Sequence, residues 1–482
     1  MKTIVDRIKT RFQHHPAQDY IDRDNINQGH SGQEHFDQDS ERPIRVLNRR
    51  LLCPDPQFSK HVKSKLAIIE RVCLDWYPGQ RSKIPQGFTY LAQLLVHEIT
   101  SREGVSQRSR ALDLDSIYGN GALIDQAGRF VYCRPTIDTV DDLFRHPHSK
   151  KAVIAEVRND ENMIIAQIYL LLLKFHNKVM DCLEEEPRYK KSGMLCRFKK
   201  AKYFVTAIFQ KIIFEDLLPR LTHKAVYQHF RRGGEPFIDI ADSETELPLE
   251  MTHASLRFGH SMVRDTYVLN GDHGKFKIVD LAELFRLTEE HSGPAYTGIP
   301  KSHRIDWDFF FETIDDKNSH DIGPEMASQL NPHIVKSMTD IGPRHLNIIR
   351  LNVMAGVNKN LPSGQALARS LLKRGAGDLQ LKDKLELHTK SNERLKIILE
   401  KNKLWENTPL FLFMLIEAEG PGSAGSGLGP LGSILLCEAV RNALEFDSQK
   451  HYQERLREFN SIHCLSNIQS MADLVNFTKA RL

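Results

Sequence analysis

The run MIIAQIYLLLLKF occupies residues 163–175 and is the most apolar segment of the chain. It is shorter than the roughly 20 residues that a membrane-spanning helix needs, and it contains Gln167 and Lys174. We therefore expect it to lie in a protein core, as part of a helix over residues 161–185. No transmembrane segment is expected elsewhere in the sequence.

Similar apolar-periodic stretches lie on both sides of this run, separated by short turns that contain Pro and Gly. Strand-like alternation with hairpin turn signals is scarce, so the sequence predicts a mainly α fold with few short strands. Besides residues 161–185, helices are expected at 88–99, 200–218, 252–263, 345–355, 364–372, 407–419 and 431–444.

The composition indicates a short tail followed by one large domain. Residues 13 to about 45 are rich in His, Asp, Gln, Asn and Gly and lack apolar periodicity, so we expect residues 1–45 to form a disordered polar tail. No Pro- or Ser-rich linker divides the rest of the chain. Residues 46–482 are therefore expected to form a single domain.

Charge and cysteine content exclude several classes of protein. The 66 basic residues nearly balance 62 acidic ones, so a nucleic-acid partner is not expected. Seven scattered cysteines without a C-x-x-C pair argue against a disulfide framework and a zinc ribbon. The N-terminus lacks an apolar signal-peptide region, which favours a cytoplasmic location and leaves non-classical export open. Nothing indicates an oligomeric state.

Two segments near the apolar run carry polar residues that could do chemistry. In LAQLLVHEIT, Gln93 and His97 are spaced i and i+4 and would share one helix face, although such pairs are more often structural than catalytic. In EVRNDENM, Asp160 and Glu161 would complement the dipole of the following helix. Arg158 at the same end is unfavourable unless it meets an anionic partner.

A third segment, THASLRFGHSMVRD, places two histidines around an Arg-Phe-Gly step. His253 and His260 flank this step, and Gly259 would admit close approach of another group to the backbone. A single histidine in such a segment is usually a hydrogen-bonded core residue. His260 by itself is therefore only suggestive of a ligand.

Five motifs follow one another along the chain: LAQLLVHEIT, LDLDSIYG, RNDEN with FHNKV, LRFGHSMV, and LNVMAG with NLPSGQALA. In this order the sequence resembles the animal haem peroxidase (peroxidase-cyclooxygenase) superfamily, the group of myeloperoxidase and its bacterial relatives. The resemblance runs from roughly Ala92 to Val440. It implies a large single-domain helical haem peroxidase fold that binds haem b.

The resemblance also assigns roles to individual residues. It makes His97 the distal histidine, Gln93 the distal amide and Arg158 the distal arginine. His260 would be the axial ligand of the haem iron, with Asn352 bonded to its other ring nitrogen. A neutral His97 would move the peroxide proton, and Arg158 would stabilise the charge that develops as the O–O bond breaks.

Three positions bear on how haem is held. Val96 stands where relatives with ester-linked haem carry an aspartate, whereas Glu161 matches the second ester-forming carboxylate. Haem is therefore expected to be noncovalent or singly linked through Glu161. Arg257 is assigned to the haem-binding residues. It stands where the fatty-acid dioxygenases of the superfamily carry a radical tyrosine, which disfavours that activity.

The sequence also offers a set of oxygen ligands for a hard cation. Asp113 and Asp115 lie in RALDLDSIYG, Ser109 precedes them, and Glu98 directly follows His97. Such ligands suit calcium, and the resemblance implies a calcium site beside the distal histidine. Glu98 stands where aspartate is usual and the intervening loop is short. Ordinary turn carboxylates remain the alternative interpretation.

The leading functional hypothesis is a haem-dependent peroxidase that reduces hydrogen peroxide and oxidises a small organic donor. One alternative is a haem-dependent fatty-acid or lipid dioxygenase of the same superfamily, and another is a non-catalytic haem-binding protein. A non-catalytic scaffold would have no need of the distal residues, which speaks against the last. The identity of the donor is not indicated.

Overall fold

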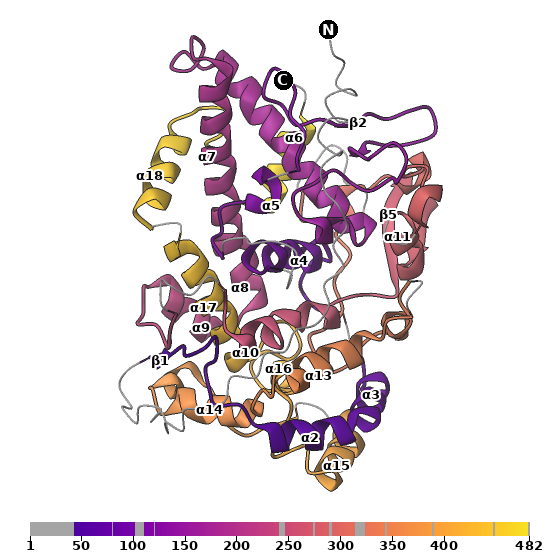
Figure 1. The fold of residues 1–482 in the computed structure, drawn as a ribbon, viewed down its shortest axis with the longest axis vertical. Helices are drawn as coiled ribbons and strands as arrows, with labels where there is room; N and C mark the ends of the chain where they lie inside the picture. Colours follow the sequence, from indigo (N-terminus) through magenta and orange to yellow (C-terminus); the bar gives the residue numbers. More distant parts are fainter. Residues whose placement is uncertain are drawn as a thin grey trace, which may run out of the picture. The chain divides into compact units, whose positions relative to one another are not determined.

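The computed structural model describes residues 43–480 except residues 80, 102–109, 120, 241–245, 273–274, 289–291, 314–322, 343–344, 388–389 and 447–448. The described residues belong to one compact unit, Glu41–Leu482. This unit is mainly helical, as the sequence predicts, and its described part contains three two-stranded sheets (Figure 1).

Helices of several kinds make up most of the regular structure. The α-helices are α2 (Pro56–Ser64), α3 (Leu66–Asp75), α4 (Gly87–Ile99), α5 (Asp115–Tyr118), α6 (Met163–Glu185), α7 (Met194–Ile212), α8 (Leu218–Leu221), α9 (Lys224–Arg231), α10 (Leu249–Thr252), α11 (Leu281–Arg286), α13 (Ile348–Asn358), α14 (Gly364–Leu372), α15 (Glu393–Lys401), α16 (Leu410–Glu419), α17 (Pro430–Phe446), α18 (Gln449–Asn460) and α19 (Met471–Lys479). The strands are β1 (Ile44–Arg45), β2 (Tyr132–Cys133), β3 (Asp142–Leu143), β4 (Ile238–Asp239), β5 (Thr266–Asp272) and β6 (Lys275–Asp280). The 3₁₀ segments are η1 (Val157–Asp160), η3 (Ser255–Ser261), η4 (Gly293–Ala295), η5 (Lys301–His303), η6 (Trp307–Phe309), η7 (Lys336–Thr339), η8 (Ala376–Leu379) and η9 (Lys390–Asn392), and η2 (Ile213–Leu217) is a π-helical turn.

The apolar run at residues 163–175 lies within α6, the core helix that the sequence predicts. The helix begins at Met163 because the Asn162 side chain caps it, accepting a hydrogen bond from the backbone N–H of Ile165. The residues just before the cap form the 3₁₀ turn η1 instead of a first helical turn. Among the described helices, α6 alone is long and apolar enough to cross a membrane, but most of it is buried inside the protein.

The expected helix at residues 252–263 is wrong as a single element. The structure has the short helix α10 there, followed by the 3₁₀ segment η3. Ala254 separates the two with a non-helical backbone (φ −139°, ψ −67°), and Gly259 weakens any α-helix across the second part. The expected helix at 200–218 likewise starts earlier, at Met194, and changes to a π turn after Ile212.

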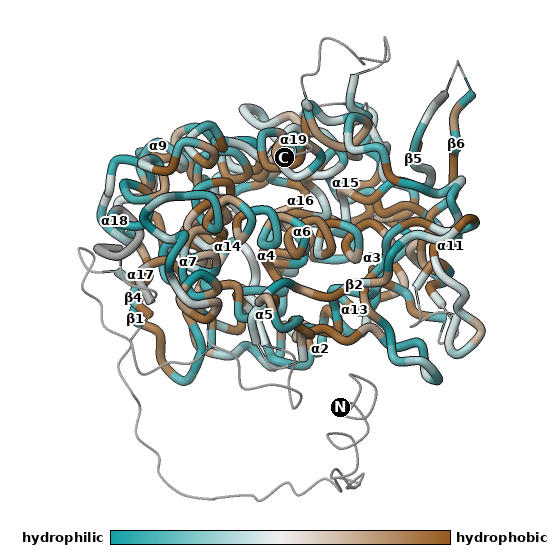
Figure 2. Tube along the Cα trace, turned by 90° about the horizontal axis from the view of Figure 1, so that it is seen from above, coloured by the Kyte–Doolittle hydropathy of each residue, from teal (hydrophilic) through white to brown (hydrophobic). Residues whose placement is uncertain are grey.

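The core contains one helix that is hydrophobic on every side. In α16 nearly every residue is buried, which is the pattern of a helix surrounded by other elements. It packs against η3, α13, α14 and α17, while α6 packs along both α4 and α7. Figure 2 shows hydrophobic residues along these inner segments and hydrophilic ones toward the outside. Helix α16 therefore supports η3, the segment that carries His260.

The sheets are small. Strands β1 and β4 pair in parallel, and β2 pairs with β3 in an antiparallel ladder. Strands β5 and β6 form an antiparallel hairpin in which Thr266 pairs with Asp280, with an irregularity between Val268 and Asn270. This hairpin extends away from the helices at one edge (Figure 2).

Candidate haem site

Helix α4 brings Gln93 and His97 to one face, as their spacing predicts. The helix starts against the segment after η6: a Cβ at Gly87 would come within 2.5 Å of the Phe310 carbonyl oxygen, so only glycine fits there. His97 is buried, and its Nδ1 lies 2.9 Å from Oδ1 of Asn159 in η1. With the amide oxygen as acceptor, Nδ1 carries the ring proton and Nε2 carries the lone pair.

The other side of the His97 ring faces a carboxylate and an amide. Nε2 of His97 lies 4.0 Å from Oε2 of Glu161. The same oxygen accepts a hydrogen bond of 3.3 Å from Nε2 of Gln93, whose own oxygen lies 3.4 Å from Nδ2 of Asn162. Gln93 and His97 of α4 thus converge with Glu161, which lies between η1 and α6.

Arg158 binds the end of α4. Its guanidinium donates to the carbonyl oxygens of His97 (2.9 Å) and Thr100 (2.6 Å) and to the Thr100 hydroxyl (3.1 Å). It also pairs with Glu156, which in turn caps η1. A cation is favourable at the negative end of a helix dipole, so this placement explains how an arginine is tolerated before α6. These bonds fix η1 to the turn that carries His97.

A buried ion cluster also holds η1. Arg145 donates two hydrogen bonds to Asp160, at 2.6 and 2.8 Å, and a third of 2.7 Å to Asp142. The Tyr296 hydroxyl donates to Asp142 at 2.8 Å, and the Tyr296 ring lies 4.3 Å from the Arg145 guanidinium carbon. Burial, followed by the Asp142 charge, raises the pKa of Tyr296. Asp160 lies between Asn159 and Glu161, so this cluster helps position both.

His260 lies in η3 and is held by a helix from far along the chain. Its Nδ1 lies 3.1 Å from Oδ1 and 3.0 Å from Nδ2 of Asn352, which is buried in α13. Burial, aided by the positive charge of Arg257, lowers the pKa of His260 to about 4, and the Asn352 hydrogen bond opposes this shift only in part. The ring is therefore neutral at physiological pH, and when the Asn352 oxygen accepts from Nδ1, the lone pair lies on Nε2, as a metal ligand requires.

Neighbouring residues fix the backbone of η3. The Ser261 hydroxyl lies 2.7 Å from the Asn331 carbonyl oxygen, and the Arg257 guanidinium donates to the Thr252 carbonyl oxygen at 3.3 Å. The second histidine of the segment, His253, interacts with the Thr252 hydroxyl at 2.8 Å. Space is open beside Gly259: a Cβ there would meet no heavy atom within 4 Å.

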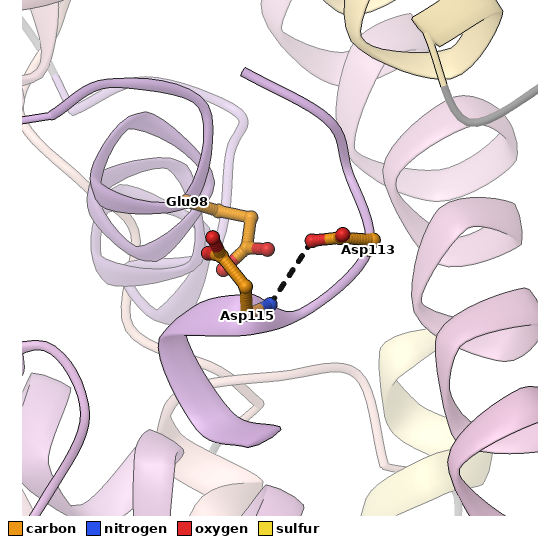
Figure 3. A group of neighbouring side chains, drawn as sticks. All are labelled: Glu98, Asp113 and Asp115. Carbon is orange, nitrogen blue, oxygen red and sulfur yellow. Dashed lines mark hydrogen bonds between the residues drawn. The ribbon is translucent and has the colours of Figure 1, made fainter. Parts of the chain in front are cut away.

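Three of the four predicted calcium ligands lie together. Ligand oxygens of Glu98, Asp113 and Asp115 all lie within 4.8 Å of one another, and Glu98 is completely buried (Figure 3). Oδ1 of Asp113 accepts the Asp115 backbone N–H at 3.1 Å, across Leu114 in a left-handed conformation (φ 60°). Ser109 lies outside the described residues.

The family model for animal haem peroxidase matches residues 55–354. This match covers more than half of the chain, and the chain belongs to the animal haem peroxidase family. A comparison with curated protein sequences finds no match.

Solved structures of similar fold include a peroxidase and several dioxygenases. The chain is similar to peroxidase A from Dictyostelium discoideum, with a TM-score of 0.60, 12% identity and 92% of each chain covered. It is also similar to the fatty acid alpha-dioxygenases of Oryza sativa (TM-score 0.57, 12% identity, 88% of this chain and 79% of that one) and Arabidopsis thaliana (0.56, 11%, 88% and 76%). At such low identity, these likenesses establish the fold alone.

The residues present fit the haem that the family implies. His260 offers a neutral imidazole whose orientation is fixed by Asn352, the arrangement that iron-binding histidines use. The open space beside Gly259 lets a flat group approach the η3 backbone. On the other segment, polar groups of Gln93, His97 and Glu161 converge at the end of α4.

Sequence reasoning missed Asn159 and Arg145. Asn159 lies within the RNDEN motif, directly after Arg158 and two residues before Glu161, which both have assigned roles, so its position was a usable signal. No local pattern marks Arg145, because its pairing with Asp160 depends on the tertiary arrangement of β3 and η1.

Proposed function

We propose that this chain is a haem-dependent peroxidase that reduces hydrogen peroxide and oxidises a small organic donor. The observation that carries the proposal is the bond between His97 Nδ1 and Asn159 Oδ1, which leaves the lone pair on Nε2 beside Glu161 and Gln93. This arrangement suits a group that accepts a proton from peroxide and returns it to the departing water.

His260 is the proposed axial ligand. Haem bound there would supply the iron that accepts the peroxide oxygen and the electrons that reduce it. The neutral state of His260 and its bond to Asn352 support this role, because a ligand must present its lone pair in a fixed direction. Arg257 would contribute positive charge beside the ligand.

Arg158 is proposed to act mainly through His97. Its donors engage Glu156 and the carbonyls of His97 and Thr100, which supports a role in positioning the end of α4. Direct stabilisation of charge on peroxide would require the guanidinium to leave these bonds. Glu161 is the proposed site of a single ester link to haem, and its carboxylate already faces the Gln93 amide.

The carboxylates of Glu98, Asp113 and Asp115 are proposed to bind calcium. One carboxylate oxygen from each residue lies within 4.8 Å of the other two, and oxygen ligands of this kind are those that a hard divalent cation prefers. Because Glu98 directly follows His97 in α4, a cation there would stiffen the turn that carries the distal histidine.

A fatty-acid dioxygenase is the second candidate, and the fold shared with two plant fatty acid alpha-dioxygenases favours it. Arg257 weighs against it, since this residue stands at the position assigned to the radical tyrosine and its guanidinium bonds to the Thr252 carbonyl. A dioxygenase would therefore need a different oxidisable residue in this chain.

The deciding experiment mixes the haem-loaded protein with hydrogen peroxide in a stopped-flow spectrometer. A fast change of the Soret band that reverses when a phenolic donor is added supports the peroxidase. A parallel assay follows oxygen uptake with palmitate, and uptake coupled to loss of the fatty acid would favour the dioxygenase. Stable haem binding without either reaction would mean that the chain is a non-catalytic haem protein.

A further inference from the structure

Trp76 is a buried tryptophan whose indole N–H donates to a buried carboxylate, and it lies outside the residues assigned to the candidate haem site. The residue directly follows α3. Its Nε1 donates a hydrogen bond of 2.5 Å to Oε2 of Glu419, the last residue of α16. Oε1 of Glu419 accepts a bond of 2.9 Å from Nδ2 of Asn392. Both carboxylate oxygens thus accept hydrogen bonds, as those of an ionised carboxylate do.

A carboxylate at the indole nitrogen makes Trp76 easier to oxidise. Loss of an electron puts a positive charge on the indole and makes its N–H acidic. The charge of Glu419 attracts that positive charge, and because the pair is buried, water screens the attraction only weakly. Oε2 of Glu419 also lies in place to accept the N–H proton along the existing hydrogen bond. The pair therefore supplies both a counter-charge and a proton acceptor for an indole radical.

A second buried tryptophan has the opposite electrostatic surroundings. Trp405 lies after α15, and Nζ of Lys396 is 5.6 Å from the centre of its ring. The ring electrons attract this cation, and the cation in turn disfavours their removal. Burial alone would make the two tryptophans alike. The neighbouring charges make Trp76 the more easily oxidised of the two.

Trp76 is connected to the segment of His260 by a short path of covalent and hydrogen bonds. The carbonyl oxygen of Pro78, two residues further along the chain, accepts from Nδ2 of Asn331 at 3.1 Å. The backbone of Asn331 forms two hydrogen bonds with the Ser261 hydroxyl, at 2.7 and 3.1 Å. Ser261 directly follows His260 in η3. An electron that moves between Trp76 and the haem site therefore has a route through bonded atoms of the protein.

The other end of this path lies at the protein surface. Tyr77, the residue after Trp76, is 51% exposed, and Leu74 in the last turn of α3 is exposed as well. The backbone N–H of Tyr77 donates to Oδ1 of Asn392 at 2.9 Å, so the asparagine that binds Glu419 also fixes the chain at this point. An exposed aromatic ring offers an aromatic donor a surface on which to stack. A donor there would lie one residue away from Trp76.

We propose that Trp76 carries single electrons from a phenolic donor at Tyr77 to the haem site at His260, so that the donor need not enter that site. This inference rests on the proposed peroxidase function, in which peroxide leaves two oxidising equivalents at the haem site. The indole gives up one electron and its N–H proton moves to Glu419. The phenol then returns an electron to the indole and releases its own proton to solvent, while the proton on Glu419 goes back to the indole nitrogen. Two such cycles convert two phenols to phenoxyl radicals, and one hydrogen peroxide takes up two electrons and two protons to become two waters.

The first measurement freezes the haem-loaded protein after mixing with hydrogen peroxide without a donor and records its electron paramagnetic resonance spectrum. We expect a radical signal that narrows when the chain is made with ring-deuterated tryptophan. Trp76→Phe should lose this signal, whereas Trp405→Phe, the matched control, should keep it. Glu419→Gln removes the charge and keeps a hydrogen-bond acceptor, and it should weaken the signal. The proposal is overturned if Trp76→Phe keeps the signal or, where that variant does not fold, if Glu419→Gln leaves it unchanged.

A second measurement separates the electron path from the reaction with peroxide. One donor is a phenol attached to dextran, which is too large to enter the protein, and the other is free guaiacol. Trp76→Phe should leave the first Soret change with peroxide and the oxidation of guaiacol unchanged, and should lose the oxidation of the dextran-bound phenol. Trp405→Phe should keep all three. Oxidation of the dextran-bound phenol at the original rate by Trp76→Phe, or equal loss of both donors, would overturn the proposed path.

A peroxide-free measurement distinguishes failure of this inference from failure of the proposed function. A photogenerated ruthenium(III) tris(bipyridine) complex removes single electrons from the full chain, and transient absorption follows the indole radical. The radical should form in the unsubstituted protein and in Trp405→Phe and be lost in Trp76→Phe. An absent Soret change with peroxide would show that the peroxidase function is wrong. An indole radical that does not depend on Trp76 would show that the electron-transfer role is wrong, whatever the haem does.

Discussion

His97 and His260 are held alike at one ring nitrogen and differ in the charge that surrounds them. In both, Nδ1 bonds to an asparagine amide, at 2.9 Å for Asn159 and 3.1 Å for Asn352. Beside His97 lies the Glu161 carboxylate, 4.0 Å from Nε2. Beside His260 lies Arg257, whose positive charge adds to burial in lowering the pKa of the ring.

This difference indicates that the two histidines have different chemical roles. An amide at Nδ1 determines which nitrogen keeps the lone pair, and the neighbouring charge determines whether protonation of that nitrogen is favourable. A nearby carboxylate attracts a protonated ring, which suits proton transfer by His97. A nearby cation repels a proton, which suits permanent ligation of a metal by His260.

Among substitutions at the two histidines and their partners, removal of His260 should have the largest effect. The His260→Ala variant should bind almost no haem on reconstitution, because no neutral imidazole remains in η3 at that position. The measurement is haem content and Soret position after reconstitution. His253→Ala is the matched control, since it removes the other histidine of the segment and should leave the spectrum unchanged. A normal spectrum in the His260 variant would refute axial ligation.

Removal of His97 should separate binding from reaction. His97→Gln should keep haem but slow the reaction with hydrogen peroxide by about 10²–10⁴-fold, the usual contribution of general acid–base catalysis. Stopped-flow traces at several peroxide concentrations measure the second-order rate constant. If the rate falls less than tenfold, the proton is carried by another group, and Glu161 at 4.0 Å would be the first to test.

The two asparagines distinguish the histidines further. Asn159→Ala should reduce the peroxide rate by roughly 10-fold and leave haem affinity nearly unchanged, because it frees the His97 ring. Asn352→Ala should weaken haem affinity by about 10–100-fold, because it frees the ligand. Both variants are assayed for haem affinity, peroxide rate and its pH profile. Equal effects of both changes on both quantities would show that the amides only stabilise the fold.

The sequence predicted those parts of the site that depend on local spacing or order. Gln93 and His97 share a face because i and i+4 are neighbours in any helix. Helix α6 begins near the expected residue because Asn162 can cap it locally. The sequence also indicated that Arg158 needs an anionic partner, and Glu156 lies only two residues before it.

What depends on distant contacts could not be predicted. The carbonyls that Arg158 binds belong to α4 and the residue after it. The hydrogen bonds from Arg145 to Asp160 require β3 to fold against η1. The segment around His260 was expected to be one helix, but the break at Ala254 shows no distinctive residue pattern. The predicted site roles of His97, Arg158 and His260 remain predictions until the variants are measured.

The smallest expected effect concerns calcium and should act on only one of the two histidines. Chelation with EGTA should lower Tm by about 2–5 °C and slow the peroxide reaction, while the Soret band of the His260-ligated haem stays in place. The reason is position: Glu98 follows His97 in α4, whereas the cluster with Asp113 and Asp115 shares no residue with η3. Asp115→Asn should reproduce the loss and make Tm insensitive to EGTA. If chelation leaves Tm unchanged, the carboxylates are ordinary turn residues. If chelation moves the Soret band as much as it slows the reaction, the two histidines are not independently supported.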